Sequence, residues 1–251
     1  MDDAVVPTLA NLAGFITATI GRIGTVGDVP GGVAVACTVP VANGYVNAVF
    51  RTDPDAPPTA LLDGARAFFD RIGHPFVVWI EPGDDELFAA CLAAGATEDP
   101  EDTPGMVISR PIPLPTGLEV RQATTPEDRE TFGALCETGY GMPGLAWMID
   151  HHQMFDAPGT LWVIASDRGT DLGVGTGFLH GRTGGIYYVG TPPEHRGRGA
   201  AATIAAWLTN RLLTDGADLV TLEASAMGFP IYERLGYTTF AHLRRCVFAR
   251  E

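Results

Sequence analysis

The stretch TPPEHRGRGAA, residues 191–201, places two arginines and two glycines just before an alanine-rich run. The first backbone amides of a helix have no partner within it and lie at the positive end of its dipole, so they bind anions. Arg196 and Arg198 would add positive charge, and Gly197 and Gly199 would let a phosphate approach the backbone without an intervening β-carbon. The sequence therefore predicts a phosphate-binding loop whose helix begins near Gly197.

Composition limits the chemistry that the chain can do. Its 251 residues carry a formal net charge of −14, and all 16 basic residues are arginine. The lack of lysine excludes a lysine Schiff base and a P-loop lysine, and the acidic balance disfavours nucleic acid and anionic membranes as partners. The four cysteines form no CxxC pair, which favours packed, reduced thiols. No apolar run approaches a membrane span, and the acidic first residues do not resemble a secretion signal, so we expect a cytoplasmic protein.

Two halves of the chain repeat one order of elements. We predict a domain over residues 1–110, a proline-rich linker over 111–117 and a second domain over 118–251. In each half a strand, a helix, a buried strand, a helix ending at glycine and a last strand follow one another, displaced by roughly 142 residues. The first-half counterpart of the phosphate loop, RTDPDAPP, has two aspartates and no glycine, so we expect it to bind no phosphate.

Upstream of its loop, the second half begins with a short strand and a helix. Thr125 is the expected N-cap of this helix, with Pro126 at its first position. A short helix near residues 145–155 and two paired strands follow, which gives the order β-α-α-β-β-β-α-β-α-β. The predicted fold class is α/β (α+β), with a mixed central sheet flanked by helices in each half.

Two motifs in the second half together resemble the GNAT superfamily of N-acetyltransferases. Arg196, Gly199 and Ala201 fill the Arg/Gln-x-x-Gly-x-Gly/Ala pattern of its coenzyme A pyrophosphate loop. The stretch LVTLEASAMGFPIYERLGYTTF, residues 219–240, resembles the family's next strand and the helix that carries its tyrosine. The resemblance covers residues 118–251, and the first half resembles degenerate GNAT-like domains by order and pattern alone. Tandem GNAT-like folds are therefore expected.

The resemblance implies transfer of an acetyl group from acetyl-CoA to an amine of a small molecule or peptide, by direct attack in a ternary complex and without a metal. It implies that coenzyme A contacts Val189, Gly190, Thr191, Arg196, Gly197, Arg198, Gly199, Ala200, Ala201, Ser225 and Tyr232. Ser225 stands where the family often has asparagine. An amide between Val189 and Thr191 would bind the developing oxyanion, and Tyr232 would give a proton to the leaving thiolate.

Several alternatives stay open at this stage. Tyr232 could be a core aromatic, and Glu223, a candidate general base, could be a surface carboxylate. Tyr188 and His180 are further catalytic candidates. The protein could be a non-catalytic acyl-CoA sensor rather than an enzyme, and a monomer or a homodimer.

Residues 140–155 are also open to two interpretations. Their Met, Trp and Phe side chains could border the acceptor pocket or belong to the core. Asp150, His151, His152 and Asp156 in this stretch suggest a solvated or substrate-lip segment rather than a metal cluster.

Overall fold

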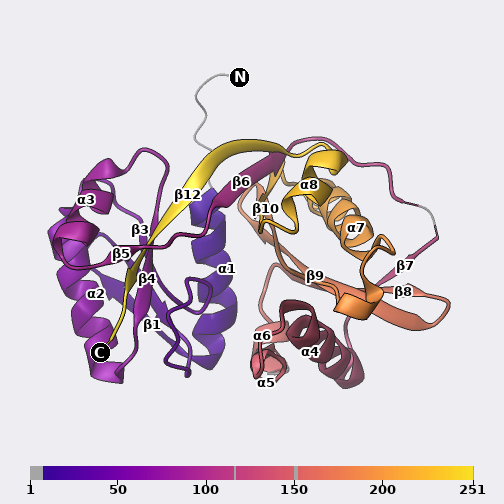
Figure 1. Cartoon of the computed structure of the whole chain (residues 1–251), viewed down its shortest axis with the longest axis horizontal. Coiled ribbons are helices and arrows are strands. Elements are labelled where there is room, and N and C mark those ends of the chain that lie inside the picture. The colour runs from indigo at the N-terminus through magenta and orange to yellow at the C-terminus, as the bar shows by residue number, and fades with distance from the viewer. Residues whose placement is uncertain (1–7, 116, 150–151, 251) are drawn as a thin grey trace. The chain divides into compact units, whose positions relative to one another are not determined.

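The computed structural model describes residues 8–115, 117–149 and 152–250. The chain forms two compact units (Figure 1). One, the N-terminal unit, comprises Leu12–Thr103 and Ala241–Glu251. The other, the C-terminal unit, comprises Met1–Asn11 and Pro104–Phe240. Three elements contribute residues to both: α1 (Thr8–Ile23), β6 (Thr103–Ile108) and β12 (Thr238–Phe248).

The N-terminal unit is built on a mixed sheet. Its other elements are β1 (Thr25–Val29), β2 (Gly32–Ala36), β3 (Asn47–Arg51), α2 (Pro58–Ile72), β4 (Phe76–Ile80), α3 (Asp85–Ala93) and β5 (Thr97–Glu98). Neighbouring strands β1, β2 and β3 pair antiparallel, β3 and β4 pair parallel, and the end of β12 closes the sheet antiparallel to β4. Apolar side chains of α2 and α3 pack on these strands in one core.

The C-terminal unit repeats this pairing pattern on a larger sheet. Its other elements are β7 (Glu119–Gln122), α4 (Pro126–Tyr140), α5 (Leu145–Ile149), α6 (His152–Phe155), β8 (Thr160–Asp167), β9 (Thr170–His180), β10 (Thr183–Gly190), α7 (Ala200–Thr214), β11 (Leu219–Glu223) and α8 (Phe229–Leu235). The strand order is β7-β8-β9-β10-β11-β6-β12. Strands β10 and β11 pair parallel, whereas β7 with β8, β8 with β9, β9 with β10 and β11 with β6 pair antiparallel. Figure 1 shows α7 and α8 on one side of this sheet and α4, α5 and α6 on the other. The predicted mixed sheet flanked by helices is confirmed.

Helix ends follow the signals read from the sequence. The Thr125 hydroxyl accepts the amide of Asp128 at 3.1 Å, and the Asp128 carboxylate accepts the amide of Thr125 at 3.1 Å. This capping box starts α4 at Pro126, as predicted. Gly236 ends α8 with a φ of 94°, a conformation that favours glycine.

Each unit takes its closing strand from the other half of the sequence. Strand β11 pairs with β6, which precedes the linker, from Val220 opposite Ile108 to Glu223 opposite Gly105. Strand β4 pairs with β12, which ends the chain. The compact units therefore do not divide at the predicted boundaries of 110 and 118. The edges of β11 and β4 each take an antiparallel partner, and β6 and β12 are both apolar strands that could serve. The sequence therefore does not show which strand pairs with which edge.

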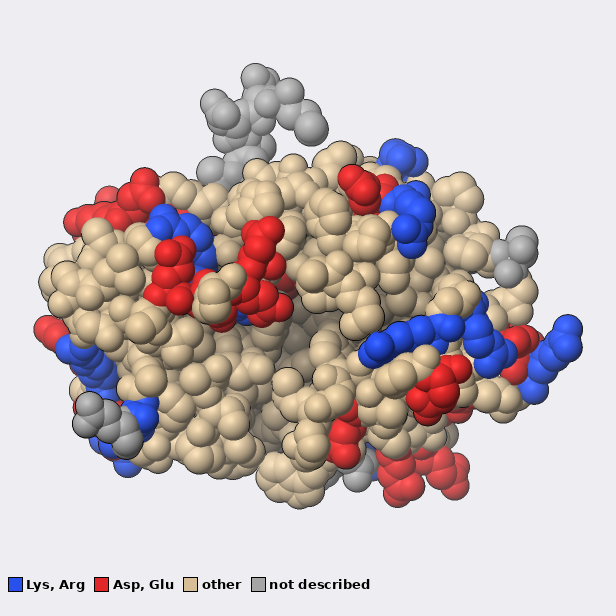
Figure 2. Space-filling model, in the orientation of Figure 1, with Lys and Arg blue, Asp and Glu red and all other residues tan. Residues whose placement is uncertain are grey.

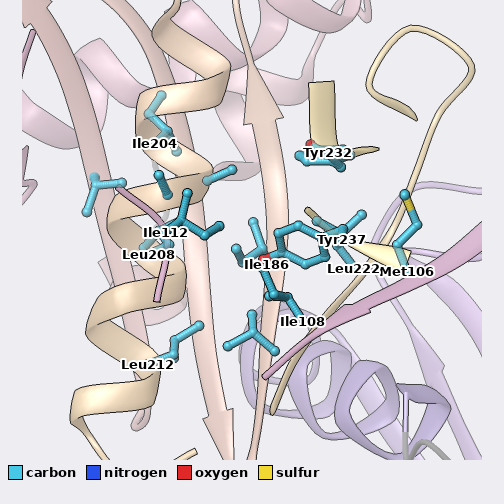
Figure 3. Packing of buried hydrophobic residues seen from close by; sticks show 14 of the residues in the cluster. Met106, Ile108, Ile112, Ile186, Ile204, Leu208, Leu212, Leu222, Tyr232 and Tyr237 are labelled. Carbon is cyan, nitrogen blue, oxygen red and sulfur yellow. The ribbon is translucent and has the colours of Figure 1, made fainter. Parts of the chain in front are cut away.

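Helix α7 lies directly on the backbone of β9. Glycines alternate along this strand, and a β-carbon on Gly175 would lie 2.4 Å from Ile204 Cγ2, while one on Gly177 would lie 3.1 Å from Leu208 Cδ2. Figure 3 shows Ile204 and Leu208 along α7 among the buried apolar side chains of this unit. The glycine face therefore fixes where α7 runs and where its N-terminus lies.

The exchange of strands yields a prediction about truncation. A fragment of residues 118–251 lacks β6 and leaves the edge of β11 open, while its segment 241–248 lacks β4 as a partner. We expect the fragment to oligomerise or aggregate in size-exclusion chromatography with light scattering. As a control, the full chain cleaved by a protease within residues 111–115 should stay together, because β6 still pairs with β11. A monomeric fragment with a cooperative thermal transition would contradict this.

A second prediction concerns pH. Burial, and then the negative charge of Asp84, raise the pKa of Glu81 from 4.5 to about 7. Between these values the folded protein binds more protons at this site than the unfolded chain, so this carboxyl lowers stability as pH rises from 4.5 to 7. We expect Glu81→Gln to reduce the difference in Tm between pH 5 and pH 8, measured by differential scanning calorimetry. An equal pH dependence in both proteins would show that Glu81 is not the group responsible.

Candidate functional site

Strands β10 and β11 separate toward their C-terminal ends. Their parallel pairing runs only from Thr183 opposite Leu219 to Gly185 opposite Thr221, although β10 continues to Gly190. On its other edge β10 has a bulge. Tyr187 pairs with Thr176 and Gly190 with Val174, so β10 advances three residues where β9 advances two. Tyr188 in this bulge has a φ of 50°, which is uncommon for a residue other than glycine. Bulge and separation leave peptide groups near Val189 without a partner on β11 among the described residues.

A buried side chain lies where the two strands part. Asn11 Nδ2 donates to the Thr183 carbonyl at 2.7 Å, and Asn11 Oδ1 accepts the Tyr187 hydroxyl at 2.6 Å. A β-carbon on Gly185 would lie 2.1 Å from Asn11 Oδ1. Asn11 therefore occupies the space that this glycine leaves. Sequence reasoning missed Asn11, because nothing near it in the chain indicates a partner more than 170 residues away.

The loop after β10 begins its helix later than predicted. A 3-10 turn covers Pro193–His195, and α7 starts at Ala200 rather than near Gly197. The reason is backbone conformation, since Gly197 and Gly199 have φ values of 76° and 84°, which a right-handed helix cannot contain. Beta-carbons on both glycines would meet nothing within 4 Å, so the space in front of the loop is open.

Among the described residues, the backbone amides just before this helix have no loop carbonyl as acceptor. The amide of Arg196 donates to the Pro193 carbonyl at 3.3 Å, and the amide of Thr203 donates to the Gly199 carbonyl at 3.0 Å. Within the described part of the chain, no hydrogen bond to a loop carbonyl occupies the amides of Gly197 to Gly199, and no side chain caps α7. These are the positions at which a helix N-terminus binds phosphate.

The two loop arginines have different partners. The Arg196 guanidinium donates to the Thr191 carbonyl at 3.3 Å and the Gly139 carbonyl at 3.2 Å, which joins the ends of β10 and α4. Arg198 pairs with Asp167 at 2.6 Å. Figure 2 shows basic side chains gathered on the surface over the region of β8 and β9. Arg196 thus shapes the loop, in addition to the charge that the sequence predicted for it.

Helix α4 forms a wall beside the end of β10. A β-carbon on Gly139 would lie 2.8 Å from the Thr191 amide nitrogen, and a β-carbon on Gly190 would lie 3.5 Å from Tyr140 Cε2. Only glycine at position 139 allows this approach. Gly139 lies in the last turn of α4, and nothing near it in the sequence indicates this contact.

Tyr232 and Tyr237 are both buried in the core of the C-terminal unit, as Figure 3 shows. The Tyr237 hydroxyl shares a hydrogen bond of 2.7 Å with the Thr209 hydroxyl. Burial, and then the nearby charge of Glu223, raise the pKa of Tyr232. Tyr232 therefore stays protonated at neutral pH and can act as a donor. The ring of Tyr232 packs closely on the backbone of Gly228. A β-carbon at position 228 would lie 2.8 Å from Tyr232 Cε2, so glycine at this position leaves room for the ring.

Glu223 and Ser225 follow on β11 and the turn after it. Glu223 is half-buried and lies opposite Gly105 of β6, and the next amide, of Ala224, donates to the Pro104 carbonyl at 2.9 Å. The Ser225 hydroxyl accepts the Gly228 amide at 3.2 Å, which stabilises the turn into α8. Strand β6, from the first half of the sequence, thus borders the candidate base.

The other candidates differ in position. His180 lies opposite Thr183 at the far end of β10, roughly 20 Å from Gly190 at the usual rise of a strand, so it is not part of the site. Tyr188 is half-buried and stacks on Trp162 at 6.3 Å.

Part of the acidic and histidine-containing stretch at residues 150–156 is not described by the structure. Asp150, His151 and the side chain of His152 lie outside what the structure describes. Among the described side chains, no group of three or more His, Cys, Asp or Glu could hold a metal ion. Where the chain is described, no helix has the length and apolarity needed to cross a membrane. All four cysteines are buried free thiols, as predicted.

In the N-terminal unit, the loop after β3 corresponds to the loop after β10. Its carbonyl oxygens are bound by an arginine of the same unit. Arg51 at the end of β3 is buried and donates to the carbonyls of Pro54 at 2.8 Å and Ala56 at 2.6 Å. It also pairs with both carboxylate oxygens of Asp84 at 2.9 Å. Here β3 and β4 stay paired up to Phe50 opposite Trp79, one residue before each strand ends. The amides of Thr52, Asp53 and Ala56 in this loop donate to carbonyls of the same unit, in contrast to the amides before α7.

The comparisons with known proteins agree with this geometry. Residues 179–240 match the family described as acetyltransferase (GNAT) domain. A curated acetyltransferase from Yersinia pestis (strain Pestoides F) is 32% identical over 82 residues, which are 32% of this chain and 58% of that protein. The chain thus spans less than two thirds of the length of the curated relatives that it matches.

Two solved structures are similar over both units. A GCN5-related N-acetyltransferase from Kribbella flavida has a TM-score of 0.73 and 18% identity, over 96% of each chain. One from Sphaerobacter thermophilus has a TM-score of 0.60 and 19% identity, over 86% of this chain and 76% of that chain. At these identities the likeness concerns the fold.

The contrast between the two loops predicts the stoichiometry of binding. We expect isothermal titration calorimetry with acetyl-CoA to give one site per chain. Gly199→Ala, which forces alanine into a positive φ, should weaken binding at least tenfold, whereas Ala56→Gly in the other loop should leave it unchanged. Two sites per chain, or equal effects of the two substitutions, would contradict the assignment.

Proposed function

The C-terminal region of this chain is a GNAT acetyltransferase domain, and from this premise we propose that the protein transfers an acetyl group from acetyl-CoA to an amine. The observation that carries the proposal is the loop after β10, where Gly197 and Gly199 hold positive φ values and free amides precede an uncapped helix. A diphosphate accepts hydrogen bonds from such amides and is stabilised by the helix dipole.

The separation of β10 and β11 provides a place for the rest of the cofactor. Val189, Gly190 and Thr191 run past the last pair between these strands, so their peptide groups can bond a pantetheine chain. Acetyl-CoA supplies the activated thioester. The amide of Val189, in the bulge, would donate to the carbonyl oxygen as it gains negative charge.

Two side chains are assigned to proton transfer. An amine with an ordinary pKa of about 10 arrives protonated and must lose a proton before it attacks the thioester. Glu223 accepts this proton, directly or through water. The neutral amine attacks the thioester carbon and forms the C–N bond, and the C–S bond then breaks as the Tyr232 hydroxyl donates a proton to the leaving sulfur. The nitrogen loses its second proton as the amide forms, and this proton restores the Tyr232 hydroxyl through solvent. The raised pKa of Tyr232 keeps that proton available at neutral pH.

A pair of tyrosine variants tests this function. Tyr232→Phe should leave the Kd for acetyl-CoA within twofold and lower kcat about a hundredfold, since it removes only a proton donor. Tyr237→Phe is the matched control, because it removes the hydrogen bond to Thr209 and should cost about 1 kcal/mol of stability while kcat stays near that of the parent. Thiol release with a panel of amines measures turnover.

The same experiment separates an enzyme from an acyl-CoA sensor. Tight binding of acetyl-CoA without thiol release for any amine would favour the sensor. Equal kcat values for the parent and Tyr232→Phe would remove Tyr232 from the mechanism.

A further inference from the structure

The turn between β8 and β9 borders the loop after β10. Strand β9 runs antiparallel to β10, with Val174 opposite Gly190, so the start of β9 lies at the same end of the sheet as the end of β10. A β-carbon on Gly173 would lie 2.8 Å from the Gly190 carbonyl oxygen and 3.4 Å from the β-carbon of Ala200, the first residue of α7. The turn that precedes β9 is therefore a neighbour of the loop that leads into α7.

This turn has a defined backbone conformation. Asp167, the last residue of β8, pairs with Thr170 across the turn. The two residues between them, Arg168 and Gly169, have φ values of 49° and 81°. Positive φ at both central residues is typical of the two-residue turns that join paired strands. The strand pairing therefore fixes the place of Asp167.

Asp167 brings a negative charge to the loop after β10. Its carboxylate accepts a hydrogen bond from the Arg198 guanidinium at 2.6 Å, and the Arg168 guanidinium lies 4.0 Å from its other oxygen. Arg196, the other arginine of the loop, donates to two backbone carbonyls instead. The positive charge of Arg198 is therefore matched by a carboxylate of the protein itself.

The ion pair between Asp167 and Arg198 is open to solvent. The side chains of Arg198 and Asp167 are 41% and 29% exposed, and ion pairs at such positions contribute little to stability. The corresponding loop of the N-terminal unit differs, because Arg51 and Asp84 are only 7% and 17% exposed and are joined by two hydrogen bonds. The Arg198 guanidinium can therefore leave its carboxylate for a stronger anion at little cost.

Arg198 stands between the two glycines whose conformation opens the loop. Gly197 and Gly199 have positive φ values, and β-carbons on them would meet nothing within 4 Å. A phosphate bound by the amides of this loop would lie within reach of the long Arg198 side chain. The phosphates of coenzyme A together carry more negative charge than one carboxylate, and the arginine fork matches phosphate geometry. A bound phosphate and Asp167 would therefore compete for the same guanidinium.

We propose that Asp167 competes with the phosphates of coenzyme A for the Arg198 guanidinium, and so limits the affinity of the loop for both acetyl-CoA and coenzyme A. This inference rests on the proposed acetyl transfer, in which coenzyme A is the product that must be released. Because the carboxylate can take over the guanidinium as the phosphate leaves, it speeds the release of this product. Asp167 thus sets the affinity for the cofactor and takes no part in the chemical step.

Neutralising the carboxylate tests the competition. We expect Asp167→Asn to lower the Kd for coenzyme A about three- to fivefold in isothermal titration calorimetry, because Arg198 no longer has to leave an ion pair. Asparagine is well tolerated at turns, so the variant should fold. The matched control is Asp215→Asn, which removes the same charge from an ion pair of similar exposure with Arg211 at the other end of α7. The Kd of this control should equal that of the parent.

A second substitution and a second ligand identify the groups that compete. In an Arg198→Gln background, Asp167→Asn should leave the Kd for coenzyme A nearly unchanged, since the guanidinium for which the carboxylate competes is absent. The same titrations with 3′-dephospho-coenzyme A distinguish the phosphates. A gain in affinity for both ligands assigns Arg198 to the diphosphate, and a gain for coenzyme A alone assigns it to the 3′-phosphate.

The opposite outcomes are equally clear. A higher Kd in Asp167→Asn would show that the carboxylate holds Arg198 in place for the phosphate, and would overturn the competition, as would equal gains in Asp167→Asn and Asp215→Asn. Tighter binding in Asp167→Asn without thiol release for any amine would refute acetyl transfer and leave the competition intact. Turnover by the parent together with an unchanged Kd in Asp167→Asn would refute the competition and leave acetyl transfer intact.

Discussion

The close packing of α7 on the glycine face of β9 is the constraint on which the candidate site depends. Gly175 and Gly177 let the helix lie against the strand backbone, with Ile204 and Leu208 in the space that larger residues would fill. This packing fixes the start of α7 beside the end of β10, where the strand has already left β11. The N-terminus of α7 and the unpaired end of β10 therefore meet at one place, and an anionic carrier with a long flexible chain fits that combination.

The exchange of closing strands makes each half of the sequence necessary to the sheet of the other half. Strand β6 belongs to the first half by sequence but lies beside Glu223 and contributes Met106 to the core around Tyr232. The end of β12 in turn brings Cys246 and Phe248 into the core of the N-terminal unit. Each sheet is complete only when both halves are present, so the role of the first half includes structural support of the site.

The two corresponding loops differ in which of their backbone groups are engaged within the protein. In the C-terminal unit, glycines with positive φ free a series of amides in front of the helix. In the N-terminal unit, the buried guanidinium of Arg51 draws the loop carbonyls inward and pairs with Asp84. The backbone of the two loops is thus used differently, although the strands around them pair in the same pattern.

The sequence by itself determined the order of elements, the glycine-rich loop at residues 196–201, its glycine-free counterpart in the first half and the capping of α4 by Thr125. These depend on local rules of backbone conformation, capping and hydrophobic period, which act over a few residues. Tertiary structure decided the rest. It alone placed Asn11 under β10, Gly139 against Thr191 and β6 beside β11, and it separated His180 from the site. The physical reason is that contacts between distant segments depend on which strand edges and helix faces meet, and equivalent edges compete for the same strands in a chain built of two similar halves.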